Sequence, residues 1–140
     1  MRAAVYLRIS QDRTGDELGV TRQRDDAQQL VSQRGWTLIH EYPDNDVSAA
    51  GKKPRPQFDA MLASVERGEI DAIVAWSLDR LTRNRRDQLR LIETCEPHRV
   101  TIALCRGSDM DLSTPAGRMS ADILASVARN EIEVKSDRSR

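Results

Sequence analysis

The chain has 140 residues, of which 39% are hydrophobic and 31% are charged, as expected for one compact globular domain. No apolar run approaches the roughly 20 residues that cross a bilayer, and residues 1–20 lack the apolar core of a signal peptide, so we expect a cytoplasmic protein. The 22 basic and 22 acidic residues give a formal charge of zero. This balance argues against a strong free-standing nucleic-acid binder, because phosphate neutralisation supplies most non-specific affinity.

Apolar runs and helical periodicity alternate along the chain. Strands are predicted over residues 3–9, 36–42, 72–76 and 100–105, and helices over 21–34, 56–67, 87–96 and from Pro115 to the end of the chain. Polar, Gly-rich or Pro-rich composition predicts a mobile loop over 11–19, a turn over 43–46, a flexible segment over 44–56 and a loop over 106–114. This order predicts an α/β domain with a mostly parallel sheet of four or five strands, covered by helices, and a long C-terminal helix.

The terminal helix carries an apolar stripe followed by strongly polar turns. The stripe consists of Met119, Ile123, Leu124, Val127 and Ile132. We divide the chain into a core, residues 1–118, and the start of an interface or linker helix, residues 119–140. Because the chain stops inside a helix without a cap, we expect it to be a fragment of a longer protein.

The remaining special residue types favour packing roles. Cys95 and Cys105 have no second pair of potential ligands, so we expect small apolar side chains and neither a disulfide nor a zinc site. Trp36 and Trp76 lie on predicted strands, where core packing is the better interpretation.

A hydroxyl and several guanidinium groups follow two of the predicted strands. Ser10 ends the first apolar run, and Arg8 lies two residues earlier, so both side chains share one strand face. The run from Ile70 to Leu78 is followed directly by Asp79, Arg80, Leu81, Thr82 and Arg83. Parallel strands present such endings at the same sheet edge. We therefore expect a serine nucleophile that attacks a phosphodiester, with arginines in place of a metal ion.

Positive charge is concentrated after the third strand, where five arginines between residues 80 and 90 face only Asp87. Arg80 and Arg83, three residues apart, are expected on one side of a helical turn. Asp79 is expected to orient a guanidinium or to assist proton transfer. The structural alternative is a serine that only caps the chain, an ordinary Asp79–Arg80 salt bridge and a solvated arginine face. Arg8 argues against it, because arginine is rarely buried without a partner.

The segment from Tyr6 to Ser10 resembles the nucleophile motif of the serine site-specific recombinases, the group of resolvases, invertases and large serine integrases. Further blocks follow in the same order as in that family: Gln23; Asp46-Val47-Ser48 with Lys53-Pro54-Arg55-Pro56; Ser77 to Arg83; Thr114 to Gly117; and Glu131 to Arg138. The block from Ser77 to Arg83 is the most specific. The segment from Ser10 to Gln23 and the loop Lys52-Lys53-Pro54-Arg55-Pro56 are most similar to those of large integrases and transposases.

The resemblance implies that Ser10 attacks a DNA phosphate, forming a 5′-phosphoserine link and a free 3′-hydroxyl, and that religation needs no ATP, metal or other cofactor. It implies that Arg8, Arg80 and Arg83 bind the phosphate, with Arg55 supplied by the mobile loop. Asp79 belongs to the same catalytic group. Tyr6, Gln23, Ser48 and Glu131 are then supporting polar groups.

The family also implies partners. These are double-stranded DNA, a second copy of the chain on each site and a tetramer in synapsis, with the long last helix forming much of the interfaces. The chain then corresponds to a catalytic domain without its DNA-reading part, encoded by a phage or a bacterial mobile element. A transposase or a resolvase with the same chemistry stays open as an alternative to an integrase.

Two alternatives come from other classes. Asp44, Asp46 and Asp79 suggest a metal-dependent nuclease, although the first two lie in a predicted turn, where acids are common for backbone reasons. The other is a phosphate-responsive receiver-like module, which shares the doubly wound plan. Receivers need an acidic cluster at the strand ends, whereas this sequence has Ser and Arg there.

Overall fold

The computed structural model describes residues 1–9, 13–45 and 55–138, with the side chains of 13–18 and 137–138 left out. The described residues form one sheet of five strands in the order β2-β1-β3-β4-β5. These are β1 (Arg2–Ile9), β2 (Thr37–Asn45), β3 (Ala72–Ser77), β4 (Thr101–Arg106) and β5 (Met110–Asp111). The first four are parallel and β5 is antiparallel to β4. The predicted α/β class and mostly parallel sheet are confirmed.

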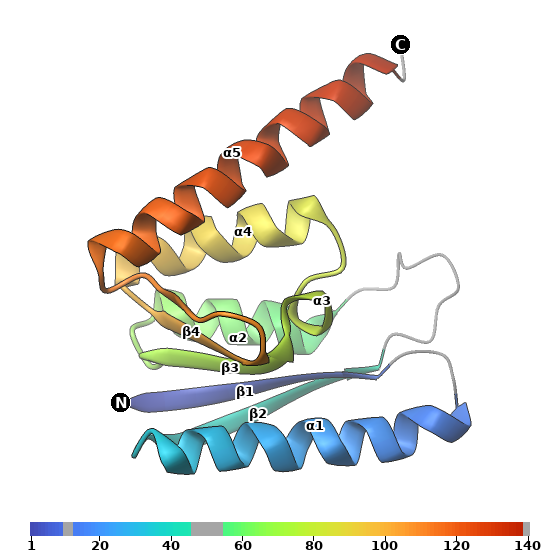
Figure 1. Cartoon of the computed structure of the whole chain (residues 1–140), viewed down its shortest axis with the longest axis vertical. Coiled ribbons are helices and arrows are strands. Elements are labelled where there is room, and N and C mark those ends of the chain that lie inside the picture. Colours follow the sequence, from blue (N-terminus) through green and yellow to red (C-terminus); the bar gives the residue numbers. More distant parts are fainter. Residues whose placement is uncertain (10–12, 46–54, 139–140) are drawn as a thin grey trace.

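Helices cover both faces of the sheet (Figure 1). Helix α1 (Arg13–Gln33) lies on one face, and α2 (Pro56–Glu66) and α4 (Arg85–Cys95) lie on the other. The short α3 (Leu78–Leu81) follows β3 directly, and a 3-10 turn η1 (Glu96–His98) follows α4. Helix α5 (Pro115–Arg138) packs on α4, and its C-terminal part extends beyond the rest of the domain (Figure 1).

The alternation of side chains along β1 divides the core in two. Ala4 and Tyr6 belong to the cluster beneath α2 and α4, whereas Val5 and Leu7 belong to the cluster beneath α1. All four are at most 1% exposed, because helices cover both faces of this central strand. By the same alternation Arg8 falls on the side of Tyr6.

The N-terminal boundaries differ from the prediction. Residues 13–19, expected in a loop, belong to α1; Gly19 lowers helix propensity without ending the helix, whose inner face is anchored by the buried Ala27 and Val31. The expected turn at 43–46 is also wrong in its first part, because β2 continues through Pro43 to Asn45. Pro43 is compatible with β2 because β2 is the edge strand, where alternate residues direct their N–H groups away from the neighbouring strand.

The C-terminal third also differs. The expected loop 106–114 contains β5, whose two residues are too few to show periodicity. Within the apolar stripe on α5, Leu124 packs against the core, whereas Met119, Ile123 and Val127 are 66%, 57% and 42% exposed. The buried side of α5 is otherwise made of small residues, Ala121, Ala125 and Ala128. Alanines allow α5 to approach α4 closely and leave the larger apolar side chains on the surface.

The block Thr114-Pro115-Ala116-Gly117 starts α5. The Thr114 hydroxyl donates to the carbonyl of Asp111 (2.9 Å) and accepts from the amide of Gly117 (3.0 Å), and Pro115 occupies the first helical position. A Cβ on Gly117 would lie 1.8 Å from the Asp111 carbonyl oxygen. The motif therefore caps the helix and lets it pass directly over the end of β5.

Candidate active site

The two strand endings singled out in the sequence meet at one edge of the sheet. Strands β1 and β3 are parallel neighbours, with Val5 opposite Val74, so their carboxyl ends lie side by side. The guanidinium of Arg8 donates a hydrogen bond to the main-chain carbonyl of Asp79, the second residue of α3. Arg8 is thereby tied to the segment that carries Asp79, Arg80 and the residues after them.

Helix α3 is a single turn that begins and ends on side-chain hydrogen bonds. The Ser77 hydroxyl accepts from the amide of Arg80 (3.3 Å), and Thr82 donates to the carbonyl of Leu78 (3.0 Å). Thr82 has an extended backbone (φ −127°, ψ 140°), so the helix ends before Arg83. The expectation that Arg80 and Arg83 share one helical turn is therefore wrong. The Asp79 side chain is exposed, and Arg80 is partly buried.

Arg55 is the most buried cation of this region, at 5% exposure. Its Nη1 donates to the Tyr6 hydroxyl (3.2 Å) and to the Leu81 carbonyl (3.1 Å), and its Nη2 donates to Asp87 (2.5 Å). Its guanidinium carbon lies 4.1 Å from the centre of the Phe58 ring. Arg55 therefore joins β1, α2, α3 and α4 at the carboxyl edge of the sheet.

The expected flexible segment 44–56 is wrong at both ends. Asp44 and Asn45 belong to β2, while Arg55 is buried and Pro56 starts α2. Residues 46–54, which include Ser48, lie outside the described residues, as does Ser10.

Asp87, which in the sequence stands out only as a lone countercharge, binds two of the arginines. One of its oxygens, Oδ2, accepts from Arg55 and from the main-chain amide of Arg83 (2.8 Å), and it lies 3.7 Å from Nε of Arg83. Its own amide donates to the Asn84 side chain (2.9 Å), which caps α4. The three-residue spacing of Asn84 and Asp87 resembles that of a capping box, and this spacing is the feature of the sequence that could have pointed to Asp87.

Tyr6 and Asp44 form a buried pair next to Arg55. The Tyr6 hydroxyl donates to Asp44 (2.8 Å), whose carboxylate also accepts from the amides of Gln57 (3.0 Å) and Phe58 (2.8 Å) in the first turn of α2. Burial raises the pKa of Tyr6 well above its usual range, against the opposing effect of Arg55, so the hydroxyl stays protonated. Asp44, suggested as a nuclease ligand, thus serves as a helix cap. Asp46 lies outside the described residues.

Gln23 and Glu131 have different surroundings. Gln23, on α1, is only 5% exposed, and its side-chain oxygen has no hydrogen-bond partner among the described residues. Glu131, on α5, is exposed and accepts from Nε of Arg85 (2.9 Å) at the start of α4. Glu131 therefore joins α5 to α4, and the structure gives it a surface ion pair.

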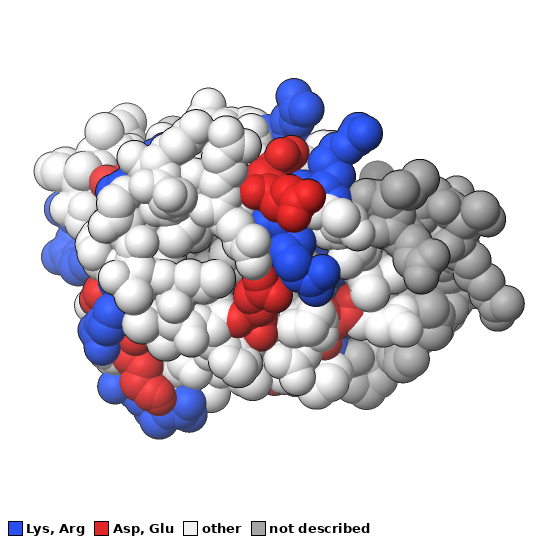
Figure 2. Space-filling view, turned by 90° about the horizontal axis from the view of Figure 1, so that it is seen from below, with Lys and Arg blue, Asp and Glu red and all other residues white. Residues whose placement is uncertain are grey.

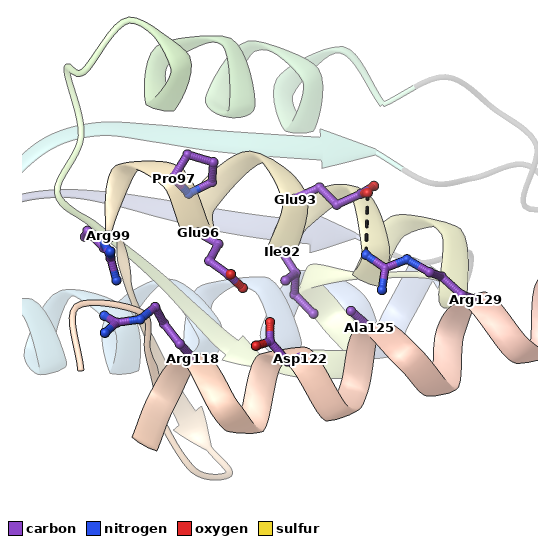
Figure 3. Close-up of a pocket in the computed structure, with 9 residues that line it drawn as sticks. All are labelled: Ile92, Glu93, Glu96, Pro97, Arg99, Arg118, Asp122, Ala125 and Arg129. Atoms are coloured by element: carbon purple, nitrogen blue, oxygen red, sulfur yellow. Dashed lines mark ion pairs between the residues drawn. The ribbon is translucent and has the colours of Figure 1, made fainter. Parts of the chain in front are cut away.

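A cavity of about 530 Å³ between α4, η1 and α5 contains none of the predicted site residues (Figure 3). Glu93 lies 3.7 Å from Arg129 across it. Glu96 and Asp122 point toward each other, and burial and the hydrogen bond to Asp122 raise the pKa of Glu96. The acidic and basic side chains that line the cavity neutralise one another. The cavity is therefore a charged contact region between helices and not part of the strand-end site.

The surface charge is mixed rather than uniformly basic. Figure 2 shows the face that α1 covers, where basic and acidic side chains lie beside one another. Arg24 of this helix pairs with Glu41 (3.1 Å), and Arg34, which directly follows the helix, pairs with Asp109 (2.6 Å). Among the helices that the structure describes, none is long and apolar enough to cross a membrane.

Comparisons with known proteins agree with this fold and sequence pattern. The family model described as resolvase, N-terminal domain, matches residues 3–140. The chain is 30% identical over 135 residues to a DNA-invertase of Escherichia phage P1, covering 96% of this chain and 64% of that protein. It is 27% identical over 137 residues to the transposon Tn2501 resolvase of Escherichia coli, covering 98% and 66%. The chain thus spans about two thirds of the length of these curated relatives.

Solved structures show the same fold. The N-terminal catalytic domain of TP901-1 integrase superposes with a TM-score of 0.77 at 24% identity, covering 96% of this chain and 99% of that one. A resolvase family site-specific recombinase from Streptococcus pneumoniae gives a TM-score of 0.74 at 17% identity, covering 99% and 95%.

Proposed function

The chain belongs to the resolvase N-terminal domain family, and from this premise we propose that it is the catalytic domain of a serine recombinase. In this proposal the Ser10 hydroxyl loses its proton as its oxygen forms a bond to a DNA phosphorus, the bond from phosphorus to the 3′-oxygen breaks, and that oxygen takes up a proton and leaves as a 3′-hydroxyl. The product is a 5′-phosphoserine ester. The reverse attack by a 3′-hydroxyl rejoins the strand, so bond energy is conserved and neither ATP nor a metal takes part.

The observation that carries this proposal is the contact between α3 and the end of β1, where Arg8 lies. Arg8, two residues before Ser10, bonds to the main chain of Asp79. Phosphoryl transfer depends on positioning and on positive charge at the non-bridging oxygens. We assign that charge to Arg8, Arg80 and Arg83.

The supporting residues have distinct roles in this proposal. Arg55 completes the positive cluster from within the core, and the protonated Tyr6 anchors Arg55. Gln23, Ser48, Asp79 and Glu131 complete the polar surroundings, with Asp79 as the group that orients a guanidinium.

The proposed assembly is a dimer on each DNA site and a tetramer in synapsis. The exposed Met119, Ile123 and Val127, spaced by four residues on α5, support this because they offer an apolar surface to a second copy. Residues 1–118 then form the catalytic core and 119–140 the start of an interface helix. We propose that the protein acts in the cytoplasm, in the integration or excision of a phage or mobile element.

The requirement for metal separates this proposal from the nuclease alternative. A protein carrying this chain at full length is incubated with duplex DNA containing its site, in EDTA or in Mg²⁺, and covalent protein–DNA product is measured on a denaturing gel. Equal yields in both buffers are expected. Loss of strand cleavage in EDTA contradicts the proposal and favours metal-dependent hydrolysis.

A further inference from the structure

We propose that Asp87 is a positioning residue for strand cleavage, whose carboxylate fixes Arg55 and Arg83 in one arrangement. This inference rests on the proposed function and adds a residue that the sequence pattern shows only as a countercharge. Asp87 acts through the two arginines, not by contact with DNA.

The carboxylate of Asp87 is shared between two cationic residues. Its Oδ2 lies 2.5 Å from Nη2 of Arg55 and 3.7 Å from Nε of Arg83. The Asp87 side chain is 16% exposed, against 4% for Arg55 and 17% for Arg83, so water screens these charges only weakly. Removing the carboxylate therefore takes away a counterion that both guanidinium groups share.

Asp87 is itself held in place by the start of α4. Its amide bonds to Asn84, and its carboxylate accepts the amide of Arg83, so both the backbone and the side chain are fixed. A carboxylate in the first turn of a helix is also favoured by the helix dipole. The Asp87 carboxylate is therefore held in place, and we infer that it sets the positions of the two arginine side chains.

Asp87 holds one of the two terminal nitrogens of the Arg55 guanidinium group. Nη1 is held by Tyr6 and Leu81, whereas Nη2 donates to Asp87. Without the carboxylate, the guanidinium keeps its Nη1 bonds and its stacking on Phe58 but loses the charged acceptor that sets its orientation. A displacement of about 1 Å in a positioned group costs on the order of 100-fold in rate.

The central experiment uses a full-length parent protein carrying Asp87→Asn, which keeps the shape of the side chain and an acceptor oxygen but removes its charge. Single-turnover cleavage of site DNA gives a maximal rate and a half-saturating protein concentration. We expect the maximal rate to fall at least about tenfold while half-saturation changes less than about twofold. The matched control is Asp59→Asn, which removes the exposed Arg90–Asp59 pair (2.5 Å) and should leave the rate unchanged.

A double variant tests whether Asp87 acts through Arg55. Arg55→Lys alone removes the same orienting bond, so the two substitutions together should lower the rate by less than the product of their separate effects, and the further loss on adding Asp87→Asn is the part that acts through Arg83. If Asp87→Asn fails to fold, Asp87→Glu and Asp87→Gln are compared, because they share length and differ in charge. The proposal then expects the Glu variant to cleave faster.

Three results contradict the proposal while wild type stays active: full-rate cleavage by Asp87→Asn, fully multiplicative losses in the double variant, or equal rates for the Glu and Gln variants. An inactive wild type would instead overturn the proposed function and this inference with it.

Discussion

Gly117 is the position where a single added methyl group has the most definite consequence for this fold. Its Cβ would lie 1.8 Å from the carbonyl oxygen and 2.5 Å from the carbonyl carbon of Asp111, well inside the 3.0 Å limit that real contacts respect. Both obstacles are backbone atoms, so no side-chain rotation relieves the contact. Gly117→Ala must therefore separate the first turn of α5 from β5.

The loss of stability expected for Gly117→Ala follows from overpacking. Forcing extra atoms into a packed site costs about 1–3 kcal/mol, and a backbone obstacle indicates the upper end of that range. The better helix propensity of alanine returns about 1 kcal/mol. A net loss of about 2 kcal/mol corresponds to a fall in Tm of roughly 4–8 °C for a domain of this size.

The assay is thermal and urea unfolding followed by circular dichroism, with Gly19→Ala as the matched control. Gly19 lies within α1, and no atom lies within 4 Å of the position that an added methyl group would take, so alanine there should raise stability, by up to about 1 kcal/mol. Opposite signs for the two substitutions are expected. A Gly117→Ala domain as stable as the wild type would refute the reasoning about the β5–α5 junction.

Two further predictions concern titratable groups. Hydrogen bonds from the Arg2 side chain lower the pKa of Asp71 from 3.8 to about 2, so the stability it adds is present above about pH 4 and is lost as pH falls toward 2. Because this pair is solvent-exposed, Asp71→Asn should cost less than about 1 kcal/mol at pH 7, and the difference in urea midpoint should shrink steadily as the pH falls from about 4 toward 2; a constant difference contradicts this. Burial raises the pKa of Cys95 to about 12, whereas Cys105 is partly exposed. A thiol reagent at pH 8 should therefore modify Cys105 before Cys95, and equal rates of modification would contradict the burial of Cys95.

The sheet could be predicted because its central strands are continuous apolar runs. Ala3 to Leu7 and Ala72 to Ala75 are buried on both faces, and such runs are visible without knowledge of their neighbours. The misplaced boundaries arise where a local signal is overridden by position in the fold. Pro43 marks a turn in most contexts, but an edge strand such as β2 can contain a proline.

The site was predictable where its residues directly follow apolar strands, whose carboxyl ends meet at one edge of a parallel sheet, and not where its residues lie outside such runs. Arg8 and the segment from Asp79 were expected at one sheet edge, and they are joined there. The role of Asp87 escapes prediction because its partner Arg55 is 32 residues away, and periodicity holds no information on such a pair. Asp44 resembles a turn residue in the sequence because the helix amides that it caps begin 13 residues later.

Identification of the residue that becomes linked to DNA tests the proposed chemistry most directly. A full-length parent protein is trapped on site DNA, digested, and the nucleotide-bearing peptide is sequenced by mass spectrometry, for the wild type, Ser10→Ala and the control Ser32→Ala on the exposed side of α1. We predict a phosphodiester on Ser10 in the wild type and the control, and no adduct in folded Ser10→Ala. An adduct that persists in Ser10→Ala, or that maps to another residue, would contradict the assignment of Ser10 as the nucleophile.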